Sequence, residues 1–349
     1  MSLFVFSGLL LVPLFEQAKR PLQHVRPPPE VPSLSAKACQ PCHAAQYNQW
    51  RASRHAQSFT NRIFKVSFRH EPLPWCVYCH APLPSQAEAI LNKRPNSVQN
   101  PTLVSEGVNC ATCHIRRGVI LSARPPSAAA KTAHAIAYRP ELATAGLCAG
   151  CHQFNFSYPG HPVRYTREPM QNTWTEWKTA RSPKPCQACH MKQGAHDFPG
   201  AHDLQFLRSA FSVQVVRQPS GDLEVRVFGH NADHRLPTGD PFRRLILTLW
   251  SGTEQTKPLA RIVYGRGFRG GPTANTWILD QDSTLPVRDG EKASEQRTVL
   301  TRSPELDTAR SFQLHYYYAA PGTHRELRPE DISTQLSAGS ITDAAQPDG

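Results

Sequence analysis

The sequence has no apolar run long enough to cross a bilayer. The longest run, residues 3–15 (LFVFSGLLLVPLF), is interrupted by Pro13, whereas a membrane-spanning helix needs about 20 apolar residues. A mean hydropathy of −0.47 also excludes a polytopic membrane protein. Residues 1–20 instead fit the apolar part of a secretory signal, with a buried strand as the alternative. We therefore expect an exported protein, periplasmic or extracellular. No cysteine lies near the run, so a lipoprotein anchor is not supported.

Charged residues are scarce, at 19% of the chain, and proline (32 residues) outnumbers glycine (20 residues). Many prolines favour loop-rich backbone over long regular elements. The chain also lacks G-x-S-x-G, a P-loop and H-E-x-x-H, which excludes the hydrolases, nucleotide-binding enzymes and zinc proteases that carry these motifs.

Unpaired cysteine is absent too, because all ten cysteines lie in C-x-x-C pairs and a histidine follows each pair. Zinc sites, redox dithiols and disulfides use such pairs without needing that histidine. Five chance hits in five pairs would occur about once in a few million cases. The pattern predicts five covalently attached haem c groups, each with two thioether bonds and a proximal histidine. The motifs are Cys39, Cys42 and His43; Cys76, Cys79 and His80; Cys110, Cys113 and His114; Cys148, Cys151 and His152; and Cys186, Cys189 and His190.

The five motifs are closely spaced, starting 37, 34, 38 and 38 residues apart. About 30 residues per haem are too few to wrap each haem separately. We therefore expect the haems to pack against one another and to replace much of the apolar core.

The formal net charge of +12 would by itself suggest a nucleic-acid partner. Five haems, however, would bring roughly ten negative charges on their propionates. We interpret the excess of Arg and Lys as compensation within the protein and expect no nucleic-acid partner.

Methionine is nearly absent, with three residues, whereas eleven histidines remain outside the motifs. A haem that only transfers electrons is normally six-coordinate, so this composition predicts histidine at both axial positions. His55 lies in a stretch without Gly or Pro, YNQWRASRHAQSF, which predicts a helix. The predicted distal ligands are His55, His134, His196, His202 and His234, with His70 and His161 as alternates.

No cysteine follows residue 189, and after about residue 205 the pattern changes to short segments that alternate with period two. Six segments predict strands: 211–216, 223–230, 244–250, 261–265, 296–301 and 311–318. The expected fold is mixed, a loop-rich α-helical multihaem domain (38–205) followed by an antiparallel β-sandwich-like domain (206–332). A signal-like segment (1–20), a Pro-rich linker (21–37) and a disordered polar tail (333–349) complete the expected organisation. The β domain would act as a lid over the haems or as a docking module.

Several further pieces occur in a characteristic order: Y-x-x-W-x-x-S-x-H at 47–55, EGVNCATCH, LCAGCHQF, MQNTWTEW followed by CQACHM, HDFPGAHD and HRLPTGDP. In this order they resemble the multihaem c-type cytochrome family related to hydroxylamine oxidoreductase and its tetrahaem partner cytochrome. The resemblance covers residues 38 to 320. It implies bis-histidine haems in parallel and perpendicular pairs. It also implies that His234, before x-x-P-T-G, reaches back to a haem.

Two functions fit these patterns. The first is electron transfer through five closely packed bis-His haems. The alternative is a multihaem oxidoreductase acting on a small nitrogen or sulfur compound at one open-coordinate haem. Pentahaem nitrite reductases use C-x-x-C-K at the catalytic haem, whereas all five motifs here end in His, so we expect no enzyme. Expected partners are redox proteins, either other cytochromes or membrane quinol or oxidoreductase complexes. A homo-oligomer or filament and peripheral membrane association stay open.

Overall fold

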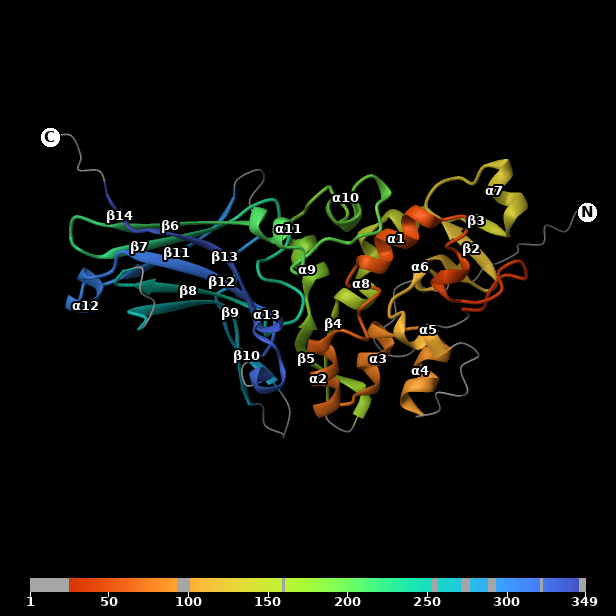
Figure 1. Cartoon of the computed structure of the whole chain (residues 1–349), viewed down its shortest axis with the longest axis horizontal. Coiled ribbons are helices and arrows are strands. Elements are labelled where there is room, and N and C mark those ends of the chain that lie inside the picture. The colour runs from red at the N-terminus through yellow and green to blue at the C-terminus, as the bar shows by residue number, and fades with distance from the viewer. Residues whose placement is uncertain are drawn as a thin grey trace, which may run out of the picture.

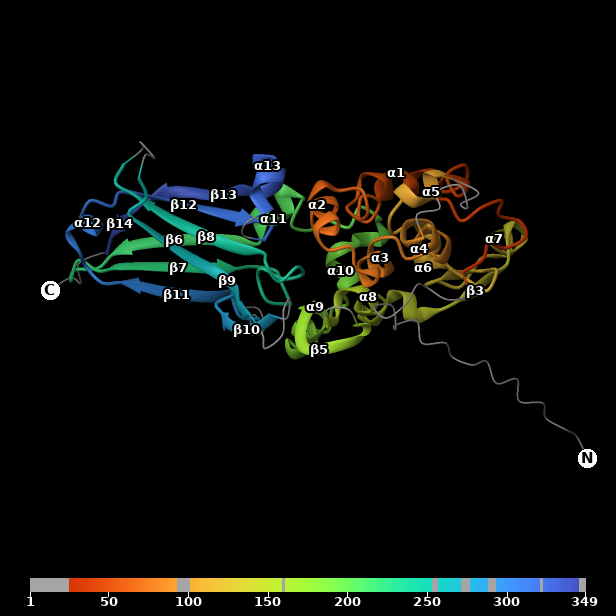
Figure 2. The ribbon, with the colours of Figure 1, turned by 90° about the horizontal axis from the view of Figure 1, so that it is seen from below.

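The computed structural model describes residues 25–92, 101–158, 161–252, 257–270, 277–287, 293–320 and 323–344. The molecule is elongated, with a helix-rich N-terminal half beside a β-rich C-terminal half (Figures 1 and 2). The signal-like segment expected at residues 1–20 lies outside the described residues. No described helix is both long and apolar enough to span a membrane.

Short helices build the N-terminal half. They are α1 (Ala44–Ala52), α2 (Arg62–His70), α3 (Pro74–His80), α4 (Pro84–Leu91), α5 (Pro101–Ser105), α6 (Cys110–His114), α7 (Ala128–Ala133), α8 (Ala145–His152), α9 (Thr173–Thr179) and α10 (Cys186–His190). Proline occupies the first position of α3 and α4, where its missing N–H has no cost. None of these helices exceeds nine residues, as the proline content predicts.

Two small sheets complete this half. One contains β1 (Ile115–Arg116), β2 (Val119–Ser122) and β3 (Ile136–Tyr138), and the other contains β4 (Phe154–Tyr158) and β5 (His161–Gln171). The buried apolar residues here fall into separate clusters of three to five residues around Trp50, Phe64 and Leu83. The helical half therefore has no single apolar core among its described residues.

The C-terminal half is built from two sheets that share one large core. One sheet has the order β10-β9-β8-β12-β13 and the other β11-β7-β6-β14. The strands are β6 (Phe211–Arg217), β7 (Leu223–Gly229), β8 (Arg244–Trp250), β9 (Ala260–Gly270), β10 (Trp277–Asp282), β11 (Ser294–Leu300), β12 (Ser311–Tyr317), β13 (Ser333–Ser340) and β14 (Thr342–Asp343). All pairings are antiparallel except β14 with β6. The mixed fold expected from the sequence, helical half first and β-sandwich-like half second, is confirmed.

The alternating residues of these strands form the shared core. Every second residue of β7 is buried, and eighteen buried residues from both sheets join in one cluster. Short helices α11 (Leu204–Ser209), α12 (Pro304–Asp307) and α13 (Pro329–Ile332) flank the sheets.

The tail expected to be disordered from residue 333 is instead part of the larger sheet. Residues 333–340 form β13, which pairs with β12 over its whole length. Leu336 is only 9% exposed and packs into the core, while a Cβ on Gly339 would lie 2.9 Å from the Phe312 ring. An edge strand with one solvated face needs few buried residues, and here Leu336 is sufficient. Because its other residues are small and polar, the strand has the composition of a disordered segment. Residues 345–349 lie outside the described residues.

The two halves are joined by buried polar contacts. Arg266 of β9 donates to Glu176 of α9, and their side chains are 7% and 2% exposed. The Thr238 hydroxyl donates to the same carboxylate at 2.6 Å and contacts the Thr173 hydroxyl at 2.8 Å. These contacts fix the segment after His234 against the helical half.

Candidate functional site

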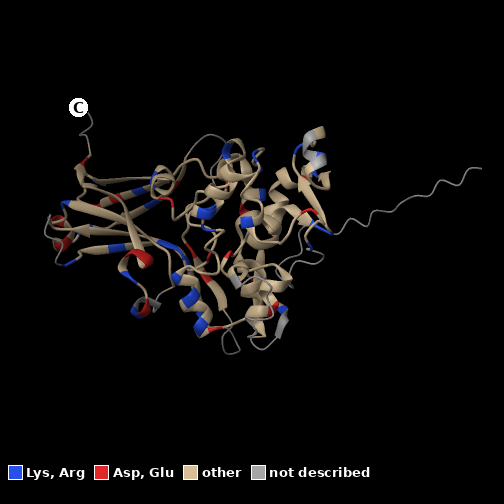
Figure 3. Cartoon of the chain, turned by 45° about the vertical axis from the view of Figure 1, so that its right-hand side comes forward, with Lys and Arg blue, Asp and Glu red and all other residues tan. Residues whose placement is uncertain are grey.

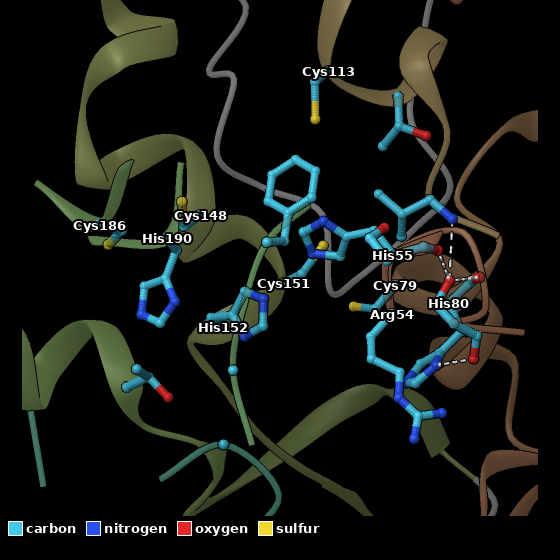
Figure 4. Close-up of a pocket in the computed structure, with 18 of the residues that line it drawn as sticks. Arg54, His55, Cys79, His80, Cys113, Cys148, Cys151, His152, Cys186 and His190 are labelled. Atoms are coloured by element: carbon cyan, nitrogen blue, oxygen red, sulfur yellow. Dashed lines mark hydrogen bonds between the residues drawn. The ribbon is translucent and has the colours of Figure 1, made fainter. Parts of the chain in front are cut away.

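A cavity of about 2820 Å³ lies in the helical half and extends to the β domain. Sites for one small ligand usually measure about 300–1,000 Å³, so this cavity has the volume for several large cofactors. All ten cysteines and all five motif histidines line it, together with the five predicted distal ligands His55, His134, His196, His202 and His234. Figure 4 shows part of this lining.

Local helix formation positions the motif side chains. The second to fifth motifs end helices α3, α6, α8 and α10, and the first motif lies in a turn that leads into α1. In a helix, positions i, i+3 and i+4 share one face. Each C-x-x-C-H segment therefore presents two thiols and an imidazole in the same direction, which two thioethers and an axial iron ligand require.

Backbone carbonyls set the tautomer of four cavity histidines. Nδ1 lies 2.7 Å from Ser58 O in His80, 2.9 Å from Leu121 O in His114, 2.7 Å from Pro199 O in His190, and 2.9 Å from Arg235 O in His234. A carbonyl oxygen only accepts, so Nδ1 must carry the proton. Each Nε2 then keeps its lone pair free toward the cavity, which is the arrangement of a metal-ligating histidine.

Three motif histidines face a predicted distal histidine at a similar separation. The ring centres are 6.5 Å apart for His152 and His55, 6.2 Å for His114 and His196, and 6.4 Å for His190 and His234. Two metal–nitrogen bonds of about 2 Å, plus about 1 Å from each nitrogen to its ring centre, give roughly 6 Å. The three ring separations therefore match the spacing of two imidazoles on one iron.

His55 is not on a helix, contrary to the sequence prediction. Helix α1 ends at Ala52, and His55 lies in the following turn. The His55 carbonyl accepts from the Ser58 hydroxyl at 2.8 Å and from the Val108 amide at 3.0 Å. These bonds hold the turn in place, so His55 is positioned by the chain around Val108 instead of by helical geometry.

His202 differs from the paired histidines. Its Nδ1 lies 2.7 Å from Nη2 of Arg54, and its ring stacks on Tyr318 with centres 4.3 Å apart. A guanidinium only donates, so Nδ1 of His202 accepts and the proton sits on Nε2. This is the opposite tautomer from that of His80, His114, His190 and His234.

The remaining candidates are placed as follows. His134 lines the cavity, and its buried Nδ1 has no hydrogen-bond partner within the described part of the chain. Among the described residues, neither the His43 ring nor the His80 ring lies against the ring of a second histidine. The His80 ring stacks on Phe64. His70 contacts Glu326 through Nε2 at 2.5 Å. His161 lies in β5.

Burial favours the neutral form of five cavity imidazoles. Desolvation lowers the pKa of His55 to about 4 and that of His152 to about 3, and other cavity histidines add to the effect. Burial also lowers the pKa values of His80, His114 and His190. A neutral imidazole is the form that binds iron, so these side chains need no deprotonation near neutral pH.

The pKa values of the motif thiols differ from one motif to another. Desolvation raises the pKa of Cys76 to about 12 and that of Cys113 to about 11, which is opposite to the lowered pKa values of reactive dithiols. Hydrogen bonds with Cys110 and Cys148 lower the pKa values of Cys39 and Cys186. Among the described residues, no three His, Cys, Asp or Glu side chains gather closely enough to hold a metal ion directly.

Thiols of different motifs touch one another. Hydrogen-bonding contacts join Cys39 to Cys110, Cys148 to Cys186 and Cys79 to Cys151. Cys113 also interacts electrostatically with Cys151. The fourth motif thus meets the second and the fifth and lies near the third, and the first motif meets the third. Sequence spacing gives no sign of this order, because it depends on how the loops fold.

Comparison with known proteins supports a haem-binding region. Residues 33–203 match the family model described as "Outer membrane cytochrome MtrC/MtrF-like, domains II/IV". The fold resembles the penta-heme cytochrome c552 from Thermochromatium tepidum, with a TM-score of 0.68 and 20% identity over 88% of this chain and 99% of that chain. A comparison with curated proteins gives no match. Residues 33–203 are therefore similar to a multihaem cytochrome domain, and together with the five motifs this similarity supports covalently attached haem c.

Proposed function

We propose that this protein transfers electrons through five haem c groups held close together in the cavity of the helical half. The observation that carries the proposal is the set of three facing histidine pairs, each with the ring separation that one iron requires. When bound, the haems supply iron centres that gain and lose single electrons. The chain supplies the thiols, the axial nitrogens and an enclosure that limits water.

The histidine pairs support an assignment of iron ligands. His152 with His55, His114 with His196, and His190 with His234 are proposed as the ligands of the fourth, third and fifth motifs. His134 and His202 are proposed for the motifs of His43 and His80, in keeping with the number of irons. His70 and His161 stay as alternates.

The contacts between motif thiols support a branched arrangement. Because thioethers fix the porphyrin edge to the cysteines, touching cysteines bring two porphyrin edges together. The fourth motif, which meets two others and lies near the third, would then be the junction, and the first, second and fifth motifs would be the three ends. Cys42 of the first motif is exposed, which favours this end for exchange with a partner.

A second candidate function rests on His202. Its tautomer, set by Arg54, leaves a proton on the nitrogen that would face an iron. If His202 does not ligate, one iron is five-coordinate and open to a small nitrogen or sulfur compound. We favour electron transfer, because the three histidine pairs and the five C-x-x-C-H motifs provide ligands for most of the iron coordination positions.

Location and partners follow from the same comparison. The matched family is of outer membrane cytochromes, which supports a place in the periplasm or at the cell surface and redox proteins as partners. Lys and Arg positions are interspersed with Asp and Glu positions along the ribbon of both halves (Figure 3). This distribution agrees with the proposal that the partner is not a nucleic acid. The order of the sequence motifs supports a relation to the hydroxylamine-oxidoreductase group.

Electron paramagnetic resonance of the oxidised holoprotein, with mass spectrometry, tests this function. We expect five attached haems and five low-spin ferric irons, because histidine on both sides gives a strong ligand field. Added nitrite or hydroxylamine should leave the spectrum unchanged. One high-spin iron in five that binds nitrite would instead establish the second candidate function.

A further inference from the structure

His234, the proposed distal ligand of the fifth motif, lies on a loop. The loop consists of residues 230–243, which connect β7 to β8. The His234 ring faces the His190 ring at 6.4 Å, with 15° between the two ring planes. Loops are more mobile than the elements they join, whereas a functional side chain must be held within about 0.5 Å of its productive position. This loop therefore needs contacts outside its own backbone.

The β domain holds one side of this loop. Leu236 and Leu285 exchange two backbone hydrogen bonds, at 3.2 Å from the Leu236 amide and 2.7 Å from the Leu285 amide. Nε of Arg235 donates to the Thr284 hydroxyl at 2.7 Å. Since residues 284 and 285 follow β10, these bonds place the loop relative to the β domain.

The helical half holds the loop on both sides of His234. Before this histidine, the Ser182 hydroxyl donates to the Asp233 carboxylate at 2.5 Å. After it, the Thr238 hydroxyl donates to Glu176 of α9 at 2.6 Å. Helix α9 lies where the two halves meet (Figures 1 and 2), and Ser182 lies in the connection that follows it. The helix and this connection therefore contact the loop at two points that enclose the ligand.

Glu176 is buried, and both of its oxygens accept hydrogen bonds. Its side chain is 2% exposed, and its carboxylate accepts from Nη2 of Arg266 and from the Thr238 hydroxyl. A hydroxyl has one proton to donate, so the Thr173 hydroxyl, 2.8 Å from that of Thr238, must be the donor in this second contact. Hydrogen bonds to an ionised acceptor are roughly twice as strong as neutral ones. A buried carboxylate of the helical half thus holds the Thr238 side chain in one orientation.

These residues belong to two separate segments of the sequence. Thr173 and Glu176 lie in MQNTWTEW, and His234 and Thr238 lie in HRLPTGDP. Haem attachment does not require the first segment, because it contains no cysteine. Contact with the loop that carries His234 gives this segment a physical role.

We propose that Glu176 and Thr238 are positioning residues for His234. The buried carboxylate fixes Thr238, and Thr238 fixes the loop so that the imidazole stays on the iron of the fifth motif. This inference rests on the proposed function. Removing a group that orients a metal ligand typically costs about 10–100-fold in metal affinity. Loss of the Thr238 hydroxyl should therefore increase the fraction of molecules in which His234 is displaced, and the other irons should keep their ligands.

Titration of the reduced holoprotein with carbon monoxide tests the proposal. Carbon monoxide binds a ferrous haem only at an open coordination position, so its apparent affinity is proportional to the fraction of molecules with His234 displaced. In Thr238→Val, which removes the hydroxyl and keeps the side-chain shape, one haem should reach half-saturation at about tenfold less carbon monoxide than in wild type. Glu176 keeps its ion pair with Arg266 in this variant, so no buried charge loses its partner.

Three further variants complete the test. Thr238→Ser keeps the hydroxyl and should give the wild-type titration. Thr298→Val removes a hydroxyl from β11, where it contacts Oη of Tyr264 at 3.4 Å, and should also give the wild-type titration. In a His234→Ala background, Thr238→Val should add no effect, because the ligand that Thr238 positions is gone.

A wild-type titration in Thr238→Val, or an undiminished effect in the His234→Ala background, would overturn the proposal. An increase spread over all five haems would also overturn it, because this outcome indicates a general loosening of the fold. If Thr238→Val yields no holoprotein, Glu176→Asp decides in the same titration, since it keeps the charge but draws the carboxylate away from Thr238. A high-spin iron in the wild-type protein would instead contradict the proposed function, before any substitution is compared.

Discussion

Without haem attachment, the helical half should stay largely unfolded while the β domain folds. The described part of the helical half has only small separate apolar clusters, whereas the β domain has eighteen buried residues in one core. The helices of the helical half have at most nine residues among those described. Isolated helices shorter than about 12–15 residues are marginal in water. The cavity of about 2820 Å³ must be filled before these helices can pack stably.

Hydrogen exchange with mass spectrometry measures this difference. Protein made in a cytoplasm without haem-attachment enzymes should show nearly unprotected amides in α3, α6, α8 and α10. Amides of β7, β8 and β12 should be protected at least about a thousandfold, which is ~4 kcal/mol. The holoprotein is the control and should be protected in both halves. Equal protection of both halves in the apoprotein would show that the haems are not the core.

Substituting His234 by alanine should convert one haem of five to the high-spin state while all five stay attached. His234 faces His190 at 6.4 Å between ring centres, and its Nδ1 proton is directed to the Arg235 carbonyl. The attachment of the haem depends on Cys186 and Cys189, which the substitution does not touch. Without the distal imidazole, the iron keeps only His190 as its axial protein ligand, and the weaker field raises its spin.

Electron paramagnetic resonance of the variant gives the result, since about one fifth of the iron should change signal. His230→Ala is a matched control, because His230 lies four residues away and its Nε2 contacts the Ser212 hydroxyl at 2.7 Å. That variant should keep five low-spin irons. An unchanged spectrum in His234→Ala would make His234 a structural residue of the turn before Pro237.

Much of the site could be predicted from the sequence, because attachment chemistry is local. A C-x-x-C-H segment contains its own thiols and proximal histidine, and all five segments line one cavity. The strands of the β domain were also predictable from their period of two, as in β7. The distal histidines entered as a set from composition, and the structure brings His55, His196 and His234 opposite motif histidines.

Other features depend on contacts far apart in the chain and leave no local pattern. The tautomer of His202 is set by Arg54, 148 positions away. Residues 333–340 have the composition of a disordered tail but form β13, because only Leu336 marks the buried face of that strand. The segment around His55 lacks Gly and Pro, which favours a helix, but hydrogen bonds from Ser58 and Val108 hold a turn there.

The most direct test of the account is an experimental structure of the holoprotein in which the axial ligands of every iron are resolved. The account predicts an iron between His152 and His55, another between His114 and His196, and a third between His190 and His234. It also predicts that the haem at Cys148 and Cys151 adjoins those of the second, third and fifth motifs. Irons ligated by other side chains in place of these pairs would contradict it.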